Sequence, residues 1–268
     1  MAGLIAACIT ILAISAVMSM TGRGGGNFYV PVLVAFGLPM LQAATIGQCI
    51  LVSTALAAAL VFHKNKTIDW KLALVIDPPT DVMAAVGGYC AHLLPGGHLA
   101  LKLLLAGLLM LAGFFMLRTV KEKPLGYHRR FGLWRRRFGD HEYVVNLWLA
   151  IPVAAATGLV AGMVGISGGS FKIPLMVLAC GVPMRVAVGT SSAMVAATAF
   201  MGLLGHSAAG DFNAAWAIPM SIVAVAGGFL GGAFSLMINP GALKRVFAYT
   251  TLAAALFMAI NASLSIAR

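Results

Sequence analysis

Long apolar segments separated by short polar breaks follow one another along almost the whole chain. Most are long enough to cross a bilayer, because a spanning helix needs about 20 apolar residues. Segments 28–38 and 171–182 are too short, since helices of that length cross only about half of the hydrocarbon core. The pattern therefore predicts an all-α polytopic membrane protein. The segments are 2–20, 28–38, 41–62, 71–93, 99–118, 144–164, 171–182, 185–204, 216–238 and 243–266.

The second half of the chain repeats features of the first half, which indicates an internal duplication. Gly22, Gly25, Gly26, Phe28 and Pro31 match Gly165, Gly168, Gly169, Phe171 and Pro174. After one inserted residue, Gly37-Leu38-Pro39-Met40 matches Gly181-Val182-Pro183-Met184. We therefore predict a first transmembrane repeat in 1–120, a basic linker in 121–143 and a second transmembrane repeat in 144–268.

The distribution of basic residues favours inverted repeats over a parallel four-plus-four arrangement. The arginine-rich linker should be cytoplasmic by the positive-inside tendency. Lys64 and Lys66 follow a long segment of the first half, whereas the matching loop 205–215 has no lysine or arginine. The positive side thus switches between the halves, as inversion requires. An odd number of crossings arises if each half has a re-entrant hairpin followed by about three spanning helices.

The composition supports a membrane protein and limits the meaning of its charge. Of 268 residues, 61% are hydrophobic and 9% are charged, whereas an average soluble domain has about 25% charged residues. The formal net charge of +11 is better explained by orientation and anionic lipid than by nucleic acid. Aromatic residues between the linker arginines favour headgroup contact, but a solvated loop that only sets topology is an equally good interpretation.

Each short segment follows a glycine-rich break, and the two breaks are the first candidate site. A chain broken within the membrane leaves N–H groups that need partners. Helix N-termini suit anions, and two related breaks could hold one anion near the midplane. The alternative is close packing of helices through small residues. The predicted oxyanion site consists of Gly24, Gly25, Gly26, Asn27, Ser167, Gly168, Gly169 and Ser170.

Further polar groups near the breaks extend this candidate site. Thr190, Ser191 and Gln48 lie near the start of the helices that follow the short segments. Their side chains either donate to a bound oxyanion or bond to neighbouring helices. Arg23 and Lys172 flank the breaks. Each side chain either attracts the anion or extends to the headgroups.

The stretch from Asp77 to Asp81 places two carboxylates inside an apolar segment. An intramembrane carboxylate costs roughly 2.5–3.5 kcal/mol on insertion scales, so it usually faces a cavity and has a function. Asp77 and Asp81 share a face if helix persists through Pro78-Pro79. We predict that they couple transport to protons, with one carboxyl group protonated. The alternative is a polar kink that pairs with Lys71 or a neighbouring helix.

No motif for catalysis or metal binding accompanies these features. The four cysteines lie in apolar stretches without Cys-x-x-Cys spacing, which is typical of buried hydrophobic residues. We expect no enzymatic activity, no metal and no cofactor. A cysteine-based membrane sulfur carrier remains a less favoured alternative, because Cys49 and Cys180 lie near the broken segments.

The second-half motifs resemble the TauE/SafE sulfite exporter family. They are the run from Gly165 to Pro174, then Gly181-Val182-Pro183, then the run from Ala187 to Ser191. The resemblance implies a multi-pass transporter of the bacterial or archaeal cytoplasmic membrane. It also implies that small sulfur-containing anions, such as sulfite or organosulfonates, move outward through a site at the glycine-rich segments. Arg23 and the stretch from Asp77 to Asp81 depart from the family pattern.

Taken with the resemblance, the residues favour a secondary transporter that exports such anions. A passive small-anion channel is the main alternative, because it would share the site and lack the coupling. The expected partners are a small anionic substrate and membrane lipid. The sequence leaves the oligomeric state open, and a homodimer is one state that it allows.

Overall fold

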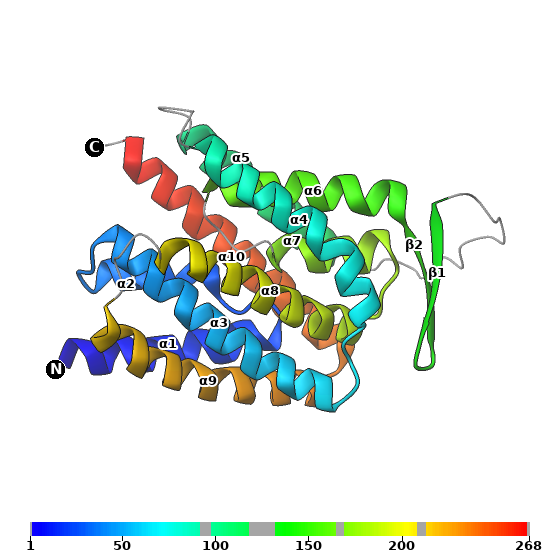
Figure 1. Cartoon of the computed structure of the whole chain (residues 1–268), viewed down its shortest axis with the longest axis horizontal. Coiled ribbons are helices and arrows are strands. Elements are labelled where there is room, and N and C mark those ends of the chain that lie inside the picture. Colours follow the sequence, from blue (N-terminus) through cyan, green and yellow to red (C-terminus); the bar gives the residue numbers. More distant parts are fainter. Residues whose placement is uncertain (1, 92–97, 118–131, 165–168, 208–212, 267–268) are drawn as a thin grey trace. The chain divides into compact units, whose positions relative to one another are not determined.

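The computed structural model describes residues 2–91, 98–117, 132–164, 169–207 and 213–266, and these are mostly helical (Figure 1). This confirms the predicted helical membrane fold. Within the described ranges, four helical stretches are long and apolar enough to cross a membrane. They are Gly3–Met20, Gln42–Lys64, Met184–Met201 and Ala214–Met237. The helices are α1 (Ala2–Met20), α2 (Gly26–Ala35), α3 (Met40–Lys64), α4 (Trp70–Ala91), α5 (His98–Leu117), α6 (Leu147–Val164), α7 (Gly169–Pro174), the π-helix η1 (Leu175–Ala179), α8 (Met184–Ser207), α9 (Ala214–Met237) and α10 (Pro240–Ile266).

The helix order in the second half repeats that in the first. α3 and α8 begin at the aligned residues Met40 and Met184, each directly after a proline. A proline here removes no helical hydrogen bond, because the first N–H groups of a helix have no partner within it. The carbonyls of Pro39 and Pro183 each accept the first helical bond, at 2.9 Å. Local sequence thus starts both helices in the same way, which supports duplication.

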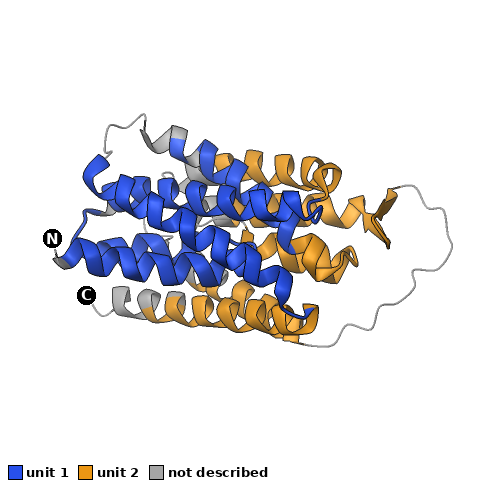
Figure 2. Ribbon diagram, turned by 90° about the horizontal axis from the view of Figure 1, so that it is seen from below, with its two compact units in different colours: residues 1–68, 188–239 blue, residues 69–187, 240–268 orange. Residues whose placement is uncertain are grey.

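Contacts divide the chain into two compact units, coloured separately in Figure 2. Unit 1 comprises Met1–Ile68 and Val188–Asn239, and unit 2 comprises Asp69–Ala187 and Pro240–Arg268. Each unit therefore takes segments from both halves of the sequence. The two units are defined by which residues contact one another, whereas the two repeats are defined by sequence similarity. The units therefore do not test the repeat boundaries 1–120 and 144–268, which stay a prediction.

In unit 1, α1 and α3 both pack on α9 through small residues. A side chain at Gly227 would meet Ser15, and one at Gly231 would meet the carbonyl of Ala16. The Ser19 hydroxyl donates to the Gly227 carbonyl at 3.2 Å. Without side chains at these positions the helix backbones approach closely, as is common between membrane helices.

In unit 2, α4 packs along α6 and α5 packs along α10. Gly158 of α6 lies against the backbone of Thr80 on α4, and Gly113 of α5 lies against Leu252 on α10. In the predicted repeat, α6 corresponds to α1 and α4 corresponds to α9. The α4–α6 pair is thus the counterpart of the α1–α9 pair in unit 1, and each pair joins the two halves. Pairing of one helix from each half is what pseudo-symmetric repeats produce. It does not distinguish an inverted repeat from a parallel repeat.

Part of the basic linker forms a β-hairpin that the sequence analysis did not predict. β1 (Leu133–Phe138) pairs antiparallel with β2 (His141–Asn146), so the hairpin continues past the predicted boundary at 143. Gly139 adopts a left-handed φ of 56° in the two-residue connection, which suits a tight hairpin turn. Burial alternates along β1, as in a half-exposed strand. The preceding linker residues lie outside the described ranges.

Candidate functional site

The first glycine-rich break is a tight turn between α1 and α2 in unit 1. Gly22, Gly24 and Gly25 have φ values of 71°, 69° and 93°, a left-handed region that favours glycine. A Cβ on Gly24 would lie 2.6 Å from Leu51, and one on Gly25 would lie 2.7 Å from the ring of Tyr29. Conformation and space therefore both require glycine here. Gly26 and Asn27 begin α2 after this turn.

Arg23 is buried in the same turn. Its Nε atom lies 3.4 Å from the Thr21 hydroxyl, and its Nη2 atom lies 3.8 Å from the Met18 sulfur. The backbone N–H of Arg23 donates to the Met18 carbonyl at 3.3 Å. The guanidinium therefore lies within unit 1, which favours an internal role over extension to the headgroups.

Two predicted site residues of unit 1 carry buried oxygen atoms without a hydrogen-bond partner in the described part of the chain. They are the Ser191 hydroxyl on α8 and the Gln48 Oε1 atom on α3. Such an atom costs about 1–3 kcal/mol when it is left unpaired. Gly24 lies against Leu51 and Val195, about one helical turn beyond these two residues. Both oxygens therefore lie close to the first break. Thr190, beside Ser191, is also fully buried.

The second break precedes a short helix that changes pitch. Ser167 and Gly168 lie outside the described residues, whereas Gly169 and Ser170 are buried at the start of α7. α7 ends at Pro174, and the π-helix η1 continues the chain. Proline has no N–H to donate, and π-helical turns occur frequently at functional sites. The segment is thus irregular, and all six residues of α7 are buried.

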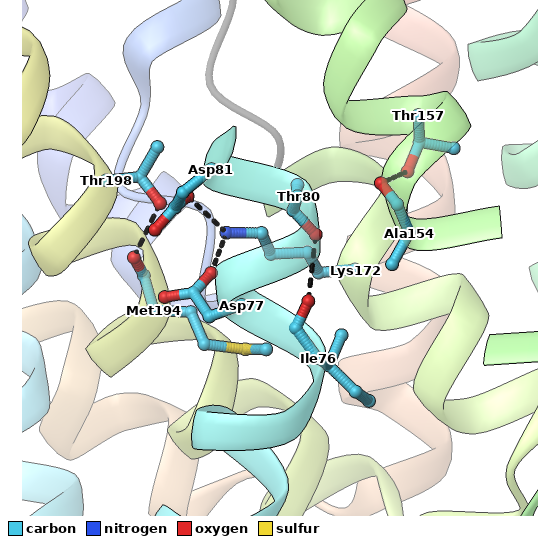
Figure 3. Close-up of polar contacts among 9 residues, drawn as sticks. All are labelled: Ile76, Asp77, Thr80, Asp81, Ala154, Thr157, Lys172, Met194 and Thr198. Atoms are coloured by element: carbon cyan, nitrogen blue, oxygen red, sulfur yellow. Dashed lines mark hydrogen bonds and ion pairs between the residues drawn. The ribbon is translucent and has the colours of Figure 1, made fainter. Parts of the chain in front are cut away.

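Lys172 on α7 is the centre of a buried ion cluster in unit 2, shown in Figure 3. Its ammonium group binds Asp77 Oδ1 and lies 3.9 Å from Asp81 Oδ1. The side chain of Lys172 is 1% exposed, whereas those of Asp77 and Asp81 are 11% and 28% exposed. The carboxylates therefore differ in their access to water and in their closeness to the ammonium group. We call these three residues the ion cluster.

Helix α4 presents both carboxylates because it continues through Pro78 and Pro79. The Thr80 hydroxyl donates to the Ile76 carbonyl at 3.0 Å. Asp77 and Asp81 consequently lie on one face of α4 and point toward Lys172 (Figure 3). Of the two expected alternatives, pairing with Lys71 is wrong because Lys71 is exposed, whereas pairing with a neighbouring helix is confirmed, since the partner is Lys172 on α7. A buried lysine and intramembrane carboxylates need partners, and that signal could have indicated the pair.

The aligned position in the first repeat has different chemistry. Tyr29 corresponds to Lys172, because each follows the matched phenylalanine of its short helix. The Tyr29 hydroxyl lies 3.0 Å from the Thr54 hydroxyl, and both side chains are fully buried. One repeat therefore has a neutral hydrogen bond where the other has an ion cluster.

A second buried ion pair lies outside the membrane-spanning segments, where the hairpin meets the start of α4. Asp69 accepts hydrogen bonds from Arg136, from the Tyr143 hydroxyl and from the Leu72 N–H at 3.2 Å. Arg136 binds with two nitrogens, one of them Nε at 3.0 Å. We call these residues the hairpin clamp. Asp69 was not among the predicted site residues, although an acidic residue just before a helix is a signal for a capping role.

The clamp shifts the acidity of its members. Burial alone raises the pKa of Asp69, but the hydrogen bonds from Arg136, Tyr143 and Leu72 outweigh it and hold the pKa below its usual value. Burial and the hydrogen bond to Asp69 raise the pKa of the Tyr143 hydroxyl. The hydrogen bond to Asp69 also raises the pKa of Arg136. All three residues therefore keep their ordinary protonation states near neutral pH.

Three of the four cysteines have side chains that the structure describes. Cys8, Cys49 and Cys180 are all free. The Cys49 sulfur lies 3.3 Å from the Ser221 hydroxyl in unit 1, and Cys180 is buried after η1. No observation on these thiols favours the sulfur-carrier alternative.

Comparison with known proteins identifies the class of this chain. A probable membrane transporter protein of Bacillus subtilis, YunE, is 27% identical over 82% of this chain and 83% of its own length. A probable membrane transporter protein of Xylella fastidiosa strain Temecula1 is also 27% identical, over 90% of this chain and 89% of its own length. No solved structure matches the chain significantly. The apolar helices and these relatives define a membrane transporter.

The family profile described as "Sulfite exporter TauE/SafE" matches residues 7–258. The chain therefore belongs to the TauE/SafE sulfite exporter family, as its glycine and proline motifs predicted. Membership implies a small-molecule substrate and a membrane environment.

Proposed function

We propose that this protein is a secondary transporter that exports small sulfur-containing anions, such as sulfite or organosulfonates, across the bacterial or archaeal cytoplasmic membrane. The family description supports the substrate class. The observation that carries an anionic substrate is the buried ammonium group of Lys172 on the short helix after the second break. A cation at that depth is expensive and is normally kept for a function.

The proposed binding groups include those that the sequence indicated. In unit 1 they are the backbone of the first break, Arg23, Gln48, Thr190 and Ser191. The unpaired buried oxygens of Gln48 and Ser191 support a polar ligand near them. In unit 2 they are the second break and Lys172, with Asp77 and Asp81 as proton-exchanging groups. That the two breaks share one anion stays a prediction.

Direct binding to the purified protein tests the anion site. Sulfite, sulfate, sulfoacetate and taurine would be titrated into protein in lipid nanodiscs. At least one of the anions should bind, and failure of all of them would reject the proposed function. Gly25→Val should abolish binding at the first break, because the side chain would be strained at φ 93° and would clash with Tyr29. Gly107→Val is the matched control, since nothing lies within 4 Å of its added Cβ.

Transport into liposomes separates a coupled transporter from the passive channel. With an imposed pH gradient, a proton-coupled transporter concentrates the anion against its own gradient. A channel gives a flux that does not respond to the pH gradient and does not accumulate the anion. If the flux is unchanged by the pH gradient and the anion does not accumulate, the protein conducts anions without coupling to protons.

A further inference from the structure

Helices α4 and α6 come from different halves of the sequence but begin at the same end of unit 2. Gly158 of α6 lies against the backbone of Thr80 on α4. Each of these residues is about three turns from the start of its helix. Both helix starts adjoin the β-hairpin, because β2 leads directly into α6 and the clamp joins the hairpin to the residue before α4. The two helices therefore run side by side in the same direction.

The hairpin binds the start of α4 through the clamp. Arg136 and Tyr143 both reach Asp69, the residue before α4. The guanidinium carbon of Arg136 lies 5.1 Å from the centre of the Trp134 ring, where a cation is attracted to an aromatic face. The side chain of Asp69 is 1% exposed and that of Arg136 is 14% exposed. Water therefore has little access to this contact.

The hairpin is also fixed to the start of α6. α6 begins at Leu147, whose N–H donates to the Gly132 carbonyl at 2.9 Å. A Cβ on Gly132 would lie 2.0 Å from the indole of Trp148, so the turn before β1 packs directly on the first turn of α6. The two strands cross the direction of α6 (Figure 1). The hairpin thus bridges the starts of the two helices.

We infer that the hairpin is a strap that stays closed during transport and makes α4 and α6 move as one body. This inference rests on the proposed transport function and adds which helices move together. α4 belongs to the predicted first repeat and α6 to the predicted second repeat. A motion that separates 1–120 from 144–268 as two rigid bodies would have to open the strap. Alternating access is therefore expected to move other helices relative to this pair.

The contacts of the strap explain why opening it is unfavourable. Separation would take the Asp69 carboxylate and the Arg136 guanidinium away from each other, and breaking a buried charged pair is strongly unfavourable. It would also uncover Tyr143 and Val145, which are 5% and 0% exposed. Several contacts must break together, so the closed hairpin is the stable state.

The contact between the helices limits a second kind of motion. A Cβ on Gly158 would lie 2.3 Å from the Thr80 carbonyl oxygen, so backbone meets backbone with no side chain between them. Sliding α6 along α4 would bring residues larger than glycine against α4, and close packing resists such a shift. The strap at the helix starts and the glycine contact about three turns along hold the pair at two levels.

Replacing the clamp by a covalent bridge tests the inference. Asp69→Cys and Arg136→Cys would be combined in the full-length protein, with its four native cysteines replaced by alanine. Sulfite flux would be measured in proteoliposomes before and after treatment with a flexible bismaleimide. Loss of the clamp should slow the flux, and the bridge should restore it, whereas the monofunctional N-ethylmaleimide should not.

A neighbouring arginine provides the matched control. Arg137 lies on the same strand, but its side chain is 78% exposed and lies 3.9 Å from Glu142. Arg136→Gln should slow the flux, and Arg137→Gln should leave it unchanged. Wild-type flux in both variants would overturn the inference, because transport would then not need the strap.

Hydrogen exchange of the wild-type protein gives a test that needs no variant. The amides of β1 and β2 should be equally protected in proteoliposomes with and without sulfite flux. Loss of protection during flux would overturn the inference, and so would an arrest of flux when the bridge forms. Absence of flux for sulfite and for each of the other anions in the wild-type protein would instead reject the proposed function.

Discussion

Two buried ion pairs of different design lie along α4 and the residue that precedes it. At its start, Asp69 in the hairpin clamp meets Arg136, the Tyr143 hydroxyl and a backbone N–H, so both of its carboxylate oxygens are bonded. Two turns further on, Asp77 meets Lys172, and the second carboxylate of Asp81 stands nearby. In the clamp one carboxylate meets one guanidinium group, whereas in the ion cluster two carboxyl groups of different exposure face one ammonium group.

This difference indicates which pair holds the fold and which pair can change state. A charge with all its hydrogen bonds satisfied is a fixed contact, because any rearrangement breaks several bonds together. In the ion cluster the ammonium group contacts Asp77 and lies 3.9 Å from the more exposed Asp81, so one of its carboxyl groups is partly open to water. The clamp is thus expected to be structural, and the ion cluster is expected to act in transport. Four experiments test this difference between the clamp and the ion cluster.

The largest effect is expected when one partner of the ion cluster is removed. Lys172→Met leaves the buried Asp77 without its cation and should lower the free energy of unfolding by about 3–5 kcal/mol. Adding Asp77→Asn should recover a large part of that loss, because the uncompensated charge disappears. Denaturant or thermal unfolding in detergent measures both variants. Equal stability of Lys172→Met and the wild type would show that the pair does not form.

A smaller loss of stability is expected for the clamp, with no effect on coupling. Asp69→Asn removes the charge that Arg136 binds and should cost about 2–3 kcal/mol. Its transport should keep the wild-type dependence on pH, since the ion cluster is unchanged. Hydrogen exchange of β1 and β2 reports the clamp, and liposome flux at several pH values reports the coupling. A changed pH profile would show that the two pairs are linked and would end the distinction.

A still smaller loss is expected when a substitution on α6 forces α4 away from α6 near the ion cluster. Gly158→Ala places a methyl group against the backbone of Thr80, which lies between the two carboxylates in sequence. Such overpacking should cost about 1–3 kcal/mol and should slow transport. Gly107→Ala on α5 is the control, because nothing lies within 4 Å of its added Cβ. If both variants behave like the wild type, close packing of α4 on α6 does not position the cluster.

The smallest effect concerns the pH dependence of the clamp alone. The folded pKa of Asp69 lies below its unfolded value of 3.8, so ionised Asp69 stabilises the clamp above that pH and loses its effect as the pH falls through the folded pKa. The folded pKa of Tyr143 lies above its unfolded value of 10.0, so neutral Tyr143 stabilises the clamp below that pH.

Exchange protection of the hairpin should therefore be constant between about pH 5 and pH 9 and fall outside that range. Asp69→Asn removes the acidic limit and serves as the control. Loss of protection near neutral pH in the wild-type protein would contradict the fixed character of the clamp.

Much of the fold was open to prediction because its signals are local. Prolines at 39 and 183 mark the starts of α3 and α8, and the short apolar segments became α2 and α7 with η1. The hairpin was missed because arginines between aromatic residues also suit a loop at a membrane surface. Its strands form only through their pairing with each other, and apolar periodicity alone does not reveal such pairing.

The candidate site was predicted in part. Asp77 and Asp81 were recognised because carboxylates are rare in apolar segments. Their partner was not assigned, since Lys172 is 95 positions away along the chain and in the other repeat. A break in the helix at Gly24 and Gly25 was expected, and the structure shows the left-handed backbone that requires glycine there. Their part in anion binding stays a prediction.

The sequence by itself determined the helical membrane fold, its short broken helices and its family, because these depend on apolar length, on glycine and proline, and on motif spacing. Tertiary structure alone decided that Lys172 meets Asp77 while Asp69 meets Arg136. Ion pairing depends on which elements meet in the fold, and in unit 2 α4 packs along α6 and meets α7 through Lys172. Asp69, just before α4, and Asp77, within it, thereby acquire different partners and different expected roles.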